Sequence, residues 1–421
     1  MRVCLALWLG LGVVVGGIPA SAAIRAAIAV RVVTPDPLLP LSGGVGASEP
    51  SHRKEGELTV RALVVADEDT TMALVSADFL GFPAVLGDRV RARVRGISPE
   101  NILIGATHTH SAPDPYAFPD ATGKTSADLN YLRSVADRAG DAIQEALGRL
   151  EPVWIKVATA EFKGRIAYNA YAEALFDPRG SVVALIGVDD GLVRATLVNY
   201  AVHPEVLGSR QGICSPDLVG PLYDRLAARG GGTGIFFNGA LGGMVTADCR
   251  GPDGRDIQTW AEAVRIGEKL ADEALRVVAG APLQRDAQLE CRATTVRFPV
   301  ESPVIQAVLQ GSPMGYKTDA EGRVSTQVNW IRLGTAQMLT VPGEALPNIG
   351  AYLKRKLGGE HALLLGLTND AFGYILTQED WGSFRRYDYI SRTSLGERTG
   401  EIYMDAALKL AEAGAAVGSG K

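Results

Sequence analysis

The sequence predicts an α/β fold of layered mixed sheets flanked by helices, in one large domain. Apolar runs typical of β-hairpins alternate with amphipathic helical segments along the chain. No internal repeat or low-complexity linker interrupts them. The composition agrees, because 421 residues with 47% hydrophobic and 21% charged side chains are enough to bury a sizeable core.

The first 22 residues are interpreted as a signal peptide and not as part of the fold. Arg2 supplies a positive charge, residues 3–17 are continuously apolar, and the stretch ending at Ala22 has the small-x-small pattern of a cleavage site. The alternative, an uncleaved anchor, is disfavoured because the apolar run is shorter than the roughly 20 residues of a spanning helix. We therefore expect export to the periplasm or the exterior, with residues 23–421 as the mature domain.

The elements of the mature chain are expected in the following order. Residues 61–66 and 71–76 are β-rich runs joined by an acidic turn, which predicts a hairpin. Between residues 126 and 150, apolar side chains recur every three or four positions behind Thr125 and Asp128, which predicts an amphipathic helix with a capping box. Further on we expect a hairpin over 181–202 turning at Asp190-Gly191, a helix over 257–278, strands near 291–300, a hairpin across Gly334, a strand near Leu363 and a helix after Leu395.

Charge and cysteine content exclude several classes of protein. A net charge of −5 does not favour nucleic acid as a partner. Outside the signal peptide the cysteines are Cys214, Cys249 and Cys291. An exported chain can oxidise one pair, Cys214 with Cys249, but the odd count does not build a disulfide framework. No CxxC spacing indicates a thiolate metal site.

Three of the five histidines stand at the ends of predicted strands. The stretch NILIGAT predicts a buried strand that ends at His108 and His110, and side chains two apart on a strand face the same side. A histidine pair alone is more often structural than metal-binding. His203, however, ends another long apolar strand and is followed by proline. Imidazole nitrogen is a favoured zinc donor, so the three together indicate a shared site.

Glu344 is the candidate oxygen donor for this site. A zinc ion held by imidazoles in a catalytic site takes a further ligand and keeps one position open for water. Glu344 follows a strand and a Pro-Gly turn in MLTVPGEAL. An equally good reading makes it a first-turn glutamate that stabilises the helix after it.

Seven blocks in order resemble the catalytic domain of the neutral, non-lysosomal ceramidase family. They are THTHSAP, NYAVHPE, SPDLVG, FFNGALGGMVTAD, VPGEAL, LTNDAFGYILTQEDW and RRYDY, and with TPDPLLPLSGG and ALVSADFLG they extend from about Val32 to Asp388. The resemblance implies an α/β catalytic domain without the family's C-terminal β-sandwich. It also implies a lipid-like N-acyl substrate, which is compatible with transient contact with a membrane surface.

The resemblance assigns roles to individual residues. It implies that zinc is bound by four residues: His108, His203, Glu344 and Tyr374. The remaining histidine, His110, resembles the family's active-site histidine, and Tyr387 resembles a tyrosine that contacts the reacting amide. With zinc activating a water molecule, zinc and either His110 or Tyr387 would polarise the carbonyl oxygen, and His110 or a nearby carboxylate would transfer the protons.

Two departures from the family fall on the substrate side. The chain reads GGMVTAD where the family usually has Gly-Asp-Val-Ser-Pro, so that Thr246 stands nearest the serine. We interpret Thr246 as a hydroxyl on the pocket floor or as a turn residue. The chain also has Asn169-Ala170 where the family commonly has Asn-Arg. The expected activity is zinc-dependent hydrolysis of the N-acyl amide of ceramide or a related lipid. The alternatives are a zinc esterase, lactonase or deacylase, and a metal-binding protein without turnover.

Overall fold

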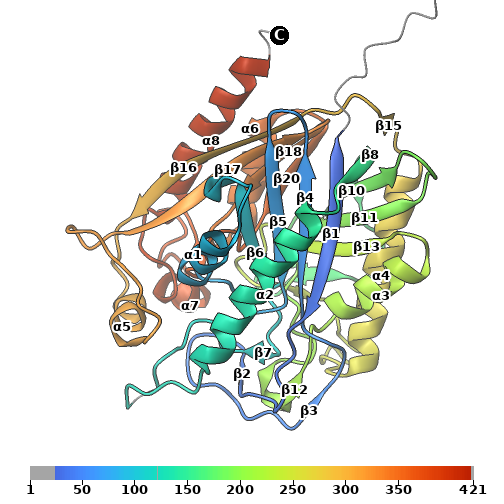
Figure 1. The fold of residues 1–421 in the computed structure, drawn as a ribbon. Coiled ribbons are helices and arrows are strands. Elements are labelled where there is room, and N and C mark those ends of the chain that lie inside the picture. The colour runs from blue at the N-terminus through green and yellow to red at the C-terminus, as the bar shows by residue number, and fades with distance from the viewer. Residues whose placement is uncertain (1–23, 121, 419–421) are drawn as a thin grey trace, which may run out of the picture.

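The computed structural model describes residues 24–120 and 122–418, so the predicted signal peptide lies outside the described part of the chain. Two β-sheets pack face to face at the centre, and helices cover the outer side of each (Figure 1). The fold class is therefore confirmed as mixed α/β with layered sheets. No helix within these residues combines the length and apolar character that crossing a membrane requires.

The larger sheet has strand order β13-β11-β10-β8-β1-β4-β5-β6, with β15 added beside β8. Its strands are β1 (Arg25–Val32), β4 (Thr59–Ala66), β5 (Thr71–Ala77), β6 (Ile102–Ala106), β8 (Glu151–Glu161), β10 (Arg179–Gly187), β11 (Val193–Tyr200), β13 (Thr233–Asn238) and β15 (Leu283–Gln284). Most neighbours are antiparallel, whereas β5 with β6 and β11 with β13 are parallel. The strands β4 and β10 are buried almost throughout because both faces of the sheet are covered.

The smaller sheet has the order β16-β17-β18-β20. Its strands are β16 (Leu289–Phe298), β17 (Val324–Leu333), β18 (Ala336–Thr340) and β20 (His361–Leu365). Gly334, with φ of 56°, provides the left-handed turn between β17 and β18. Leu74 and Leu185 of the larger sheet and Met338 and Leu363 of the smaller sheet belong to one buried cluster between the two layers. This apolar interface fixes the sheets against each other.

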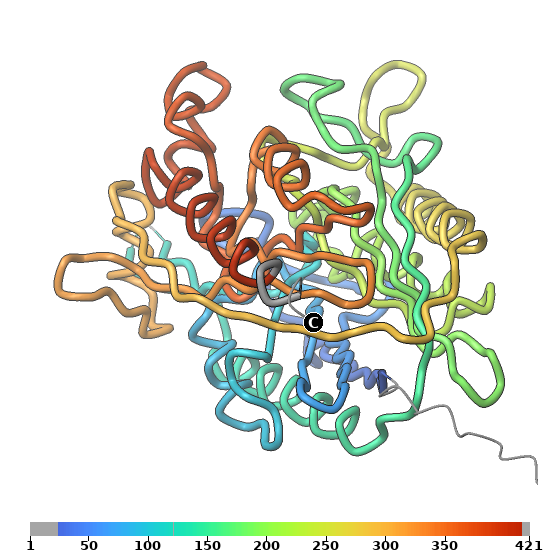
Figure 2. The backbone as a smooth tube through the Cα atoms, turned by 90° about the horizontal axis from the view of Figure 1, so that it is seen from above, coloured from blue at the N-terminus to red at the C-terminus, as the bar shows by residue number. Residues whose placement is uncertain are grey.

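Helices form the outer layers. The larger sheet is covered on one half by α1 (Ala84–Arg93) and α2 (Leu129–Leu147), and on the other half by α3 (Val219–Ala228) and α4 (Trp260–Ala279). The smaller sheet is covered by α6 (Pro347–Leu357) and α8 (Thr399–Gly418). In Figure 2 the segment from β15 to β16 crosses the molecule between its two sides, and the segment with α5 (Pro303–Gly311) extends beyond β16.

The larger sheet curls so that its two edges approach each other. The hydroxyl of Ser76 on β5 donates a 2.6 Å hydrogen bond to the carbonyl of Phe236 on β13. Arg61 on β4 likewise donates to the Gly234 carbonyl at 3.0 Å. Buried Asn199 then joins the sheets by donating to Phe237, Asn238 and Leu364, the last at 2.7 Å. The carboxyl ends of β6, β11 and β18 therefore lie close to one another.

Most predicted elements are present, with differences at their ends. The hairpins β4–β5, β10–β11 and β17–β18 and the helices α2, α4 and α8 match the expectations. The capping box was wrong, because Asp128 itself caps α2 by accepting hydrogen bonds from Asn130 and Tyr131. The cysteines Cys214, Cys249 and Cys291 are free thiols.

Candidate metal centre and its cavity

The residues of the candidate site come from three segments that lie after strands. His108 and His110 follow β6, His203 follows β11, and Glu344 follows β18 as the first residue of the short strand β19 (Glu344–Ala345). The ring centroid of His108 lies 4.8 Å from that of His110 and also 4.8 Å from that of His203. The curl of the larger sheet therefore brings together side chains that the sequence places about a hundred or more residues apart.

His108 lies in the loop after β6, which ends at Ala106, as predicted, but the rule that residues two apart on a strand face the same side does not apply to it. Its φ is 71°, a left-handed conformation that is uncommon for a residue other than glycine. The amide of His108 donates to the carbonyl of Phe79, and its Nδ1 lies 2.6 Å from the carbonyl of Leu80. His108 and His110 therefore approach each other through a loop turn and not through the pleat of a strand.

His203 is held by the short strand β14 (Val245–Ala247). Its amide donates to the carbonyl of Val245, and its Nδ1 lies 2.8 Å from the same oxygen. A carbonyl oxygen accepts only, so Nδ1 must carry the proton in His203 and in His108. The Nε2 atoms of both rings consequently present a lone pair to the site when the rings are neutral.

Both Nε2 atoms converge on one carboxylate oxygen. Oε2 of Glu344 lies 3.2 Å from Nε2 of His203 and 3.6 Å from Nε2 of His108. The side chain of Glu344 is 9% exposed, so water screens this contact weakly. Two nitrogen lone pairs directed at an anionic oxygen repel it unless a proton or a metal cation lies among them. A proton on one ring relieves this repulsion, and the same arrangement could hold a metal ion.

The pKa values of these groups place a proton on His203, and not on His108, when no metal is bound. Burial lowers the pKa of His108 to about 3, which keeps the ring neutral as a metal ligand must be. Burial opposes charge on His203 too, but its hydrogen bond to Glu344 and the charge of Glu205 raise its pKa to about 8. Glu344 has a lowered pKa because, against the effect of burial, His108 and His203 favour its charged form.

His110 completes a group of three histidines. One nitrogen from each of His108, His110 and His203 lies within 4.8 Å of the other two. Burial lowers the pKa of His110 to about 3. Its Nδ1 lies 3.6 Å from a carboxylate oxygen of Glu205, whereas its buried Nε2 has no hydrogen-bond partner. A buried nitrogen without a partner at a cation site is suited to a ligand, a water molecule or a substrate atom.

The donor set fits zinc. Imidazole nitrogens and a carboxylate oxygen are the ligands of catalytic zinc sites, and the two Nδ1–H groups held by carbonyls orient the rings as such ligands commonly are. Tyr374, the first residue of β21 (Tyr374–Ile375), pairs with Glu344 in register, and its hydroxyl helps to lower the pKa of that carboxyl. Tyr374 is 5% exposed, so its hydroxyl reaches the site from within the protein.

Tyr387 and Thr246 lie farther out. Tyr387 ends a 3-10 turn and stacks on Tyr171 with ring centroids 5.9 Å apart. The tyrosine of RRYDY that lines the cavity beside Tyr374 is instead Tyr389, which sequence reasoning missed. Thr246 lies on β14, where its backbone forms an isolated parallel β-bridge with His203. It lines a separate surface pocket. The roles assigned to Tyr387 and Thr246 remain predictions.

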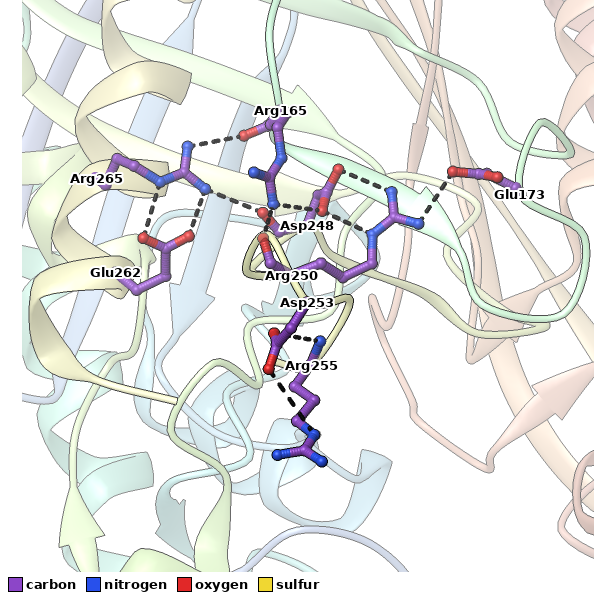
Figure 3. Close-up of polar contacts among 8 residues, drawn as sticks. All are labelled: Arg165, Glu173, Asp248, Arg250, Asp253, Arg255, Glu262 and Arg265. Atoms are coloured by element: carbon purple, nitrogen blue, oxygen red, sulfur yellow. Dashed lines mark hydrogen bonds and ion pairs between the residues drawn. The ribbon is translucent and has the colours of Figure 1, made fainter. Parts of the chain in front are cut away.

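An ion-pair network secures the segment behind His203 (Figure 3). Asp248 follows β14 and accepts hydrogen bonds from Arg165 at 3.1 Å and from Arg250 at 3.0 and 3.1 Å. Arg265 also donates to the backbone carbonyl of Asp248. The strand β14 pairs with β9 (Ala167–Asn169), whose Asn169 caps the following loop through its amide oxygen. Asn169 is thus a structural residue, and β14 is fixed on both sides.

An apolar cavity of about 350 Å³ opens over the candidate metal centre. Its floor includes His108, His110, Glu344 and Tyr374. Its walls are mostly hydrophobic: Leu80 and Phe118 line it from the segments after β5 and β7 (Ala112–Pro113), and Ile305, Val308 and Leu309 line it from α5. The volume and the apolar walls with a few polar groups at the floor are typical of small-molecule sites.

This fold is neutral ceramidase-like. The chain superposes on a neutral ceramidase from Pseudomonas aeruginosa with a TM-score of 0.75, at 16% sequence identity, over 93% of this chain and 74% of that one. A structure described as a ceramidase complexed with C2 gives a TM-score of 0.73, also at 16% identity, over 93% and 75% of the two chains. Neither the protein-family models nor the curated proteins include a match to the sequence.

Proposed function

We propose that this chain is a zinc-dependent amidohydrolase that cleaves the N-acyl amide of ceramide or a related N-acyl lipid into a fatty acid and an amine. The single observation that carries the proposal is the convergence of two oriented imidazoles on a buried carboxylate at the floor of an apolar cavity. The likeness of the fold to ceramidases supports the choice of an amide of a lipid as substrate.

The residues at the floor suit the steps of such a hydrolysis. Zinc bound by His108, His203, Glu344 and Tyr374 would supply a Lewis acid and an activated water. His110 has a free Nε2 beside that position, so it accepts a proton from the nucleophile and returns it to the leaving amine. The hydrophobic walls bind the alkyl part of the substrate and exclude other water from the reacting carbonyl.

The test is fatty-acid release from an N-acyl sphingosine by the chain that begins at residue 23, loaded with zinc. We expect release that requires zinc and that is lost in His108→Ala. A matched control is His361→Ala, because His361 is also a buried histidine but its Nδ1 lies near Thr159, away from the cavity. An unmodified protein that binds zinc stoichiometrically and releases no fatty acid would move the function to another acyl amide or ester.

Export is part of the proposal. The predicted cleavage after Ala22 rests on the sequence pattern alone. N-terminal sequencing of the protein recovered from the periplasm or the medium should give a chain that begins at Ala23. Recovery of a full-length chain from the cytoplasm would contradict it.

A further inference from the structure

A buried carboxylate lies on the wall of the apolar cavity, separate from the metal centre. Asp370 is 8% exposed and lines the cavity from the loop before β21. Its Oδ1 accepts hydrogen bonds from the backbone amides of Ala84 at 3.1 Å and Ala371 at 3.0 Å. No hydrogen bond of normal geometry to its other oxygen, Oδ2, is found among the described residues; the Thr326 hydroxyl, which has no other partner, lies close enough to lower the pKa of the carboxyl.

Two tyrosine hydroxyls lie in the vicinity of this carboxylate: burial, and to a smaller extent the charge of Asp370, raise the pKa values of Tyr116 and Tyr316. The Tyr116 hydroxyl occupies the space beside Gly81, where an added Cβ would come within 1.9 Å of the oxygen and within 2.8 Å of Ala371 Cβ. Glycine at position 81 is therefore what allows the Tyr116 ring to reach the cavity next to Asp370. The Tyr316 hydroxyl donates to the Tyr116 carbonyl at 3.3 Å, so its oxygen remains available as an acceptor.

A structural role accounts for Oδ1 of Asp370, which accepts the two backbone hydrogen bonds, but not for the negative charge of the side chain. An asparagine would accept the same two backbone hydrogen bonds through its amide oxygen, without a charge to bury. Burial raises the pKa of Asp370 to about 7, against the backbone hydrogen bonds and the charge of Arg91, so the carboxyl is partly ionised near neutral pH. A carboxylate oxygen without a hydrogen bond of normal geometry, on a residue that lines an apolar cavity, is costly unless a bound molecule supplies a donor.

We propose that Asp370, with the Tyr116 hydroxyl beside it, is a recognition point for a hydrogen-bond donor carried by the hydrocarbon part of the substrate, either a hydroxyl or an ammonium group. This inference rests on the proposed function, because it takes the cavity as the acyl-lipid site. It narrows the substrate class to N-acyl compounds that bear a polar donor within the cavity, remote from the amide that is cleaved.

The test uses binding and not turnover. Calorimetry would compare dodecanamide with its mid-chain and terminal hydroxy and amino derivatives on the zinc-loaded protein. A hydrogen bond to a buried charged acceptor predicts that at least one donor-bearing ligand binds roughly tenfold more tightly than dodecanamide. In Asp370→Asn, Oδ1 still accepts from Ala84 and Ala371, but a donor replaces the acceptor that faces the cavity. The ammonium preference should fall to about onefold in that variant.

Asp88→Asn is the matched control, because Asp88 also lines the cavity but its side chain is 76% exposed. This control should keep the preference. Equal affinity of the unmodified protein for plain and donor-bearing amides would overturn the inference, and so would an ammonium preference that persists in Asp370→Asn or a failure of every alkyl amide to bind. A preference that depends on Asp370, in a protein that cleaves no N-acyl sphingosine, would support the recognition point while refuting the ceramidase activity.

Discussion

Replacing Glu344 by glutamine separates a metal ligand from a purely structural glutamate. In the structure Oε2 of Glu344 lies 3.2 Å from Nε2 of His203 and 3.6 Å from Nε2 of His108, an arrangement that a proton on His203 or a bound metal ion stabilises. The amide nitrogen of a glutamine at this position can donate hydrogen bonds to both lone pairs. The substitution therefore satisfies the two rings without metal and removes the negative charge that attracts it.

The magnitude follows from the linkage between binding and folding. Zinc at a hundredfold excess over its dissociation constant stabilises the native protein by about 2.7 kcal/mol. Loss of the anionic ligand should weaken binding at least about 100-fold, which reduces that gain to about 0.4 kcal/mol. For a domain of this size the difference corresponds to roughly 3 °C in the midpoint of thermal unfolding. The zinc-free native protein keeps the charged hydrogen bond between His203 and Glu344 near neutral pH, so the zinc-induced shift of each protein is measured against its own zinc-free form.

Thermal unfolding with and without zinc, and zinc titration against a chelator, measure both quantities. The control is Glu360→Gln, since Glu360 is also next to a histidine, 3.9 Å from Nε2 of His361, but is 83% exposed. The control should keep the full zinc-induced shift. A Glu344→Gln protein that binds zinc with native affinity would refute the conclusion that the carboxylate is a ligand.

Three further outcomes are expected. His110→Ala should retain stoichiometric zinc by metal analysis and lose at least about 100-fold in kcat, because it removes the proton carrier and not a ligand; loss of zinc together with activity would contradict this. Gly81→Ala should destabilise the protein by about 1–3 kcal/mol in urea titrations, because its Cβ meets the Tyr116 hydroxyl, and Tyr116→Phe should restore part of the loss. Asp248 has a pKa of about 2, because its hydrogen bonds to arginines including Arg250 outweigh burial. A folded-state pKa below the unfolded value of about 3.9 stabilises the protein above that pH, and this contribution is lost as pH falls toward 2. Asp248→Asn should therefore cost about 1–2 kcal/mol at pH 7 and nearly nothing near pH 2, and an equal cost at both would refute the electrostatic explanation.

The sequence predicted those parts of the fold that depend on local pattern. The hairpin β4–β5 and the helix α2 were found because alternation and three- or four-residue spacing persist over their length. The curl of the larger sheet was not, because it depends on contacts such as that between Ser76 and Phe236, which lie 160 residues apart. The spacing of apolar residues within one segment gives no information about a contact between two distant segments.

The residues of the candidate site were likewise only partly predictable from the sequence. His108, His203 and Glu344 could be selected because each follows an apolar strand, and the structure brings them together. Tyr374 was selected only through the family resemblance. Asp370 was missed, because its backbone partner Ala84 lies 286 residues away. The one signal in the sequence was an aspartate within the otherwise mostly apolar stretch from Leu363 to Leu376.

The separation of the ligands along the chain decides when the metal can bind. His203 and Glu344 are 141 residues apart, and they meet only after the larger sheet has curled and the smaller sheet has docked on it. Contacts of this separation form late in folding, because the entropy of closing long loops must be overcome first. An extended chain, such as one in transit through a translocation channel, cannot assemble the site. Under the proposed function, zinc would therefore bind only after folding is complete, and it would come from the compartment in which folding ends.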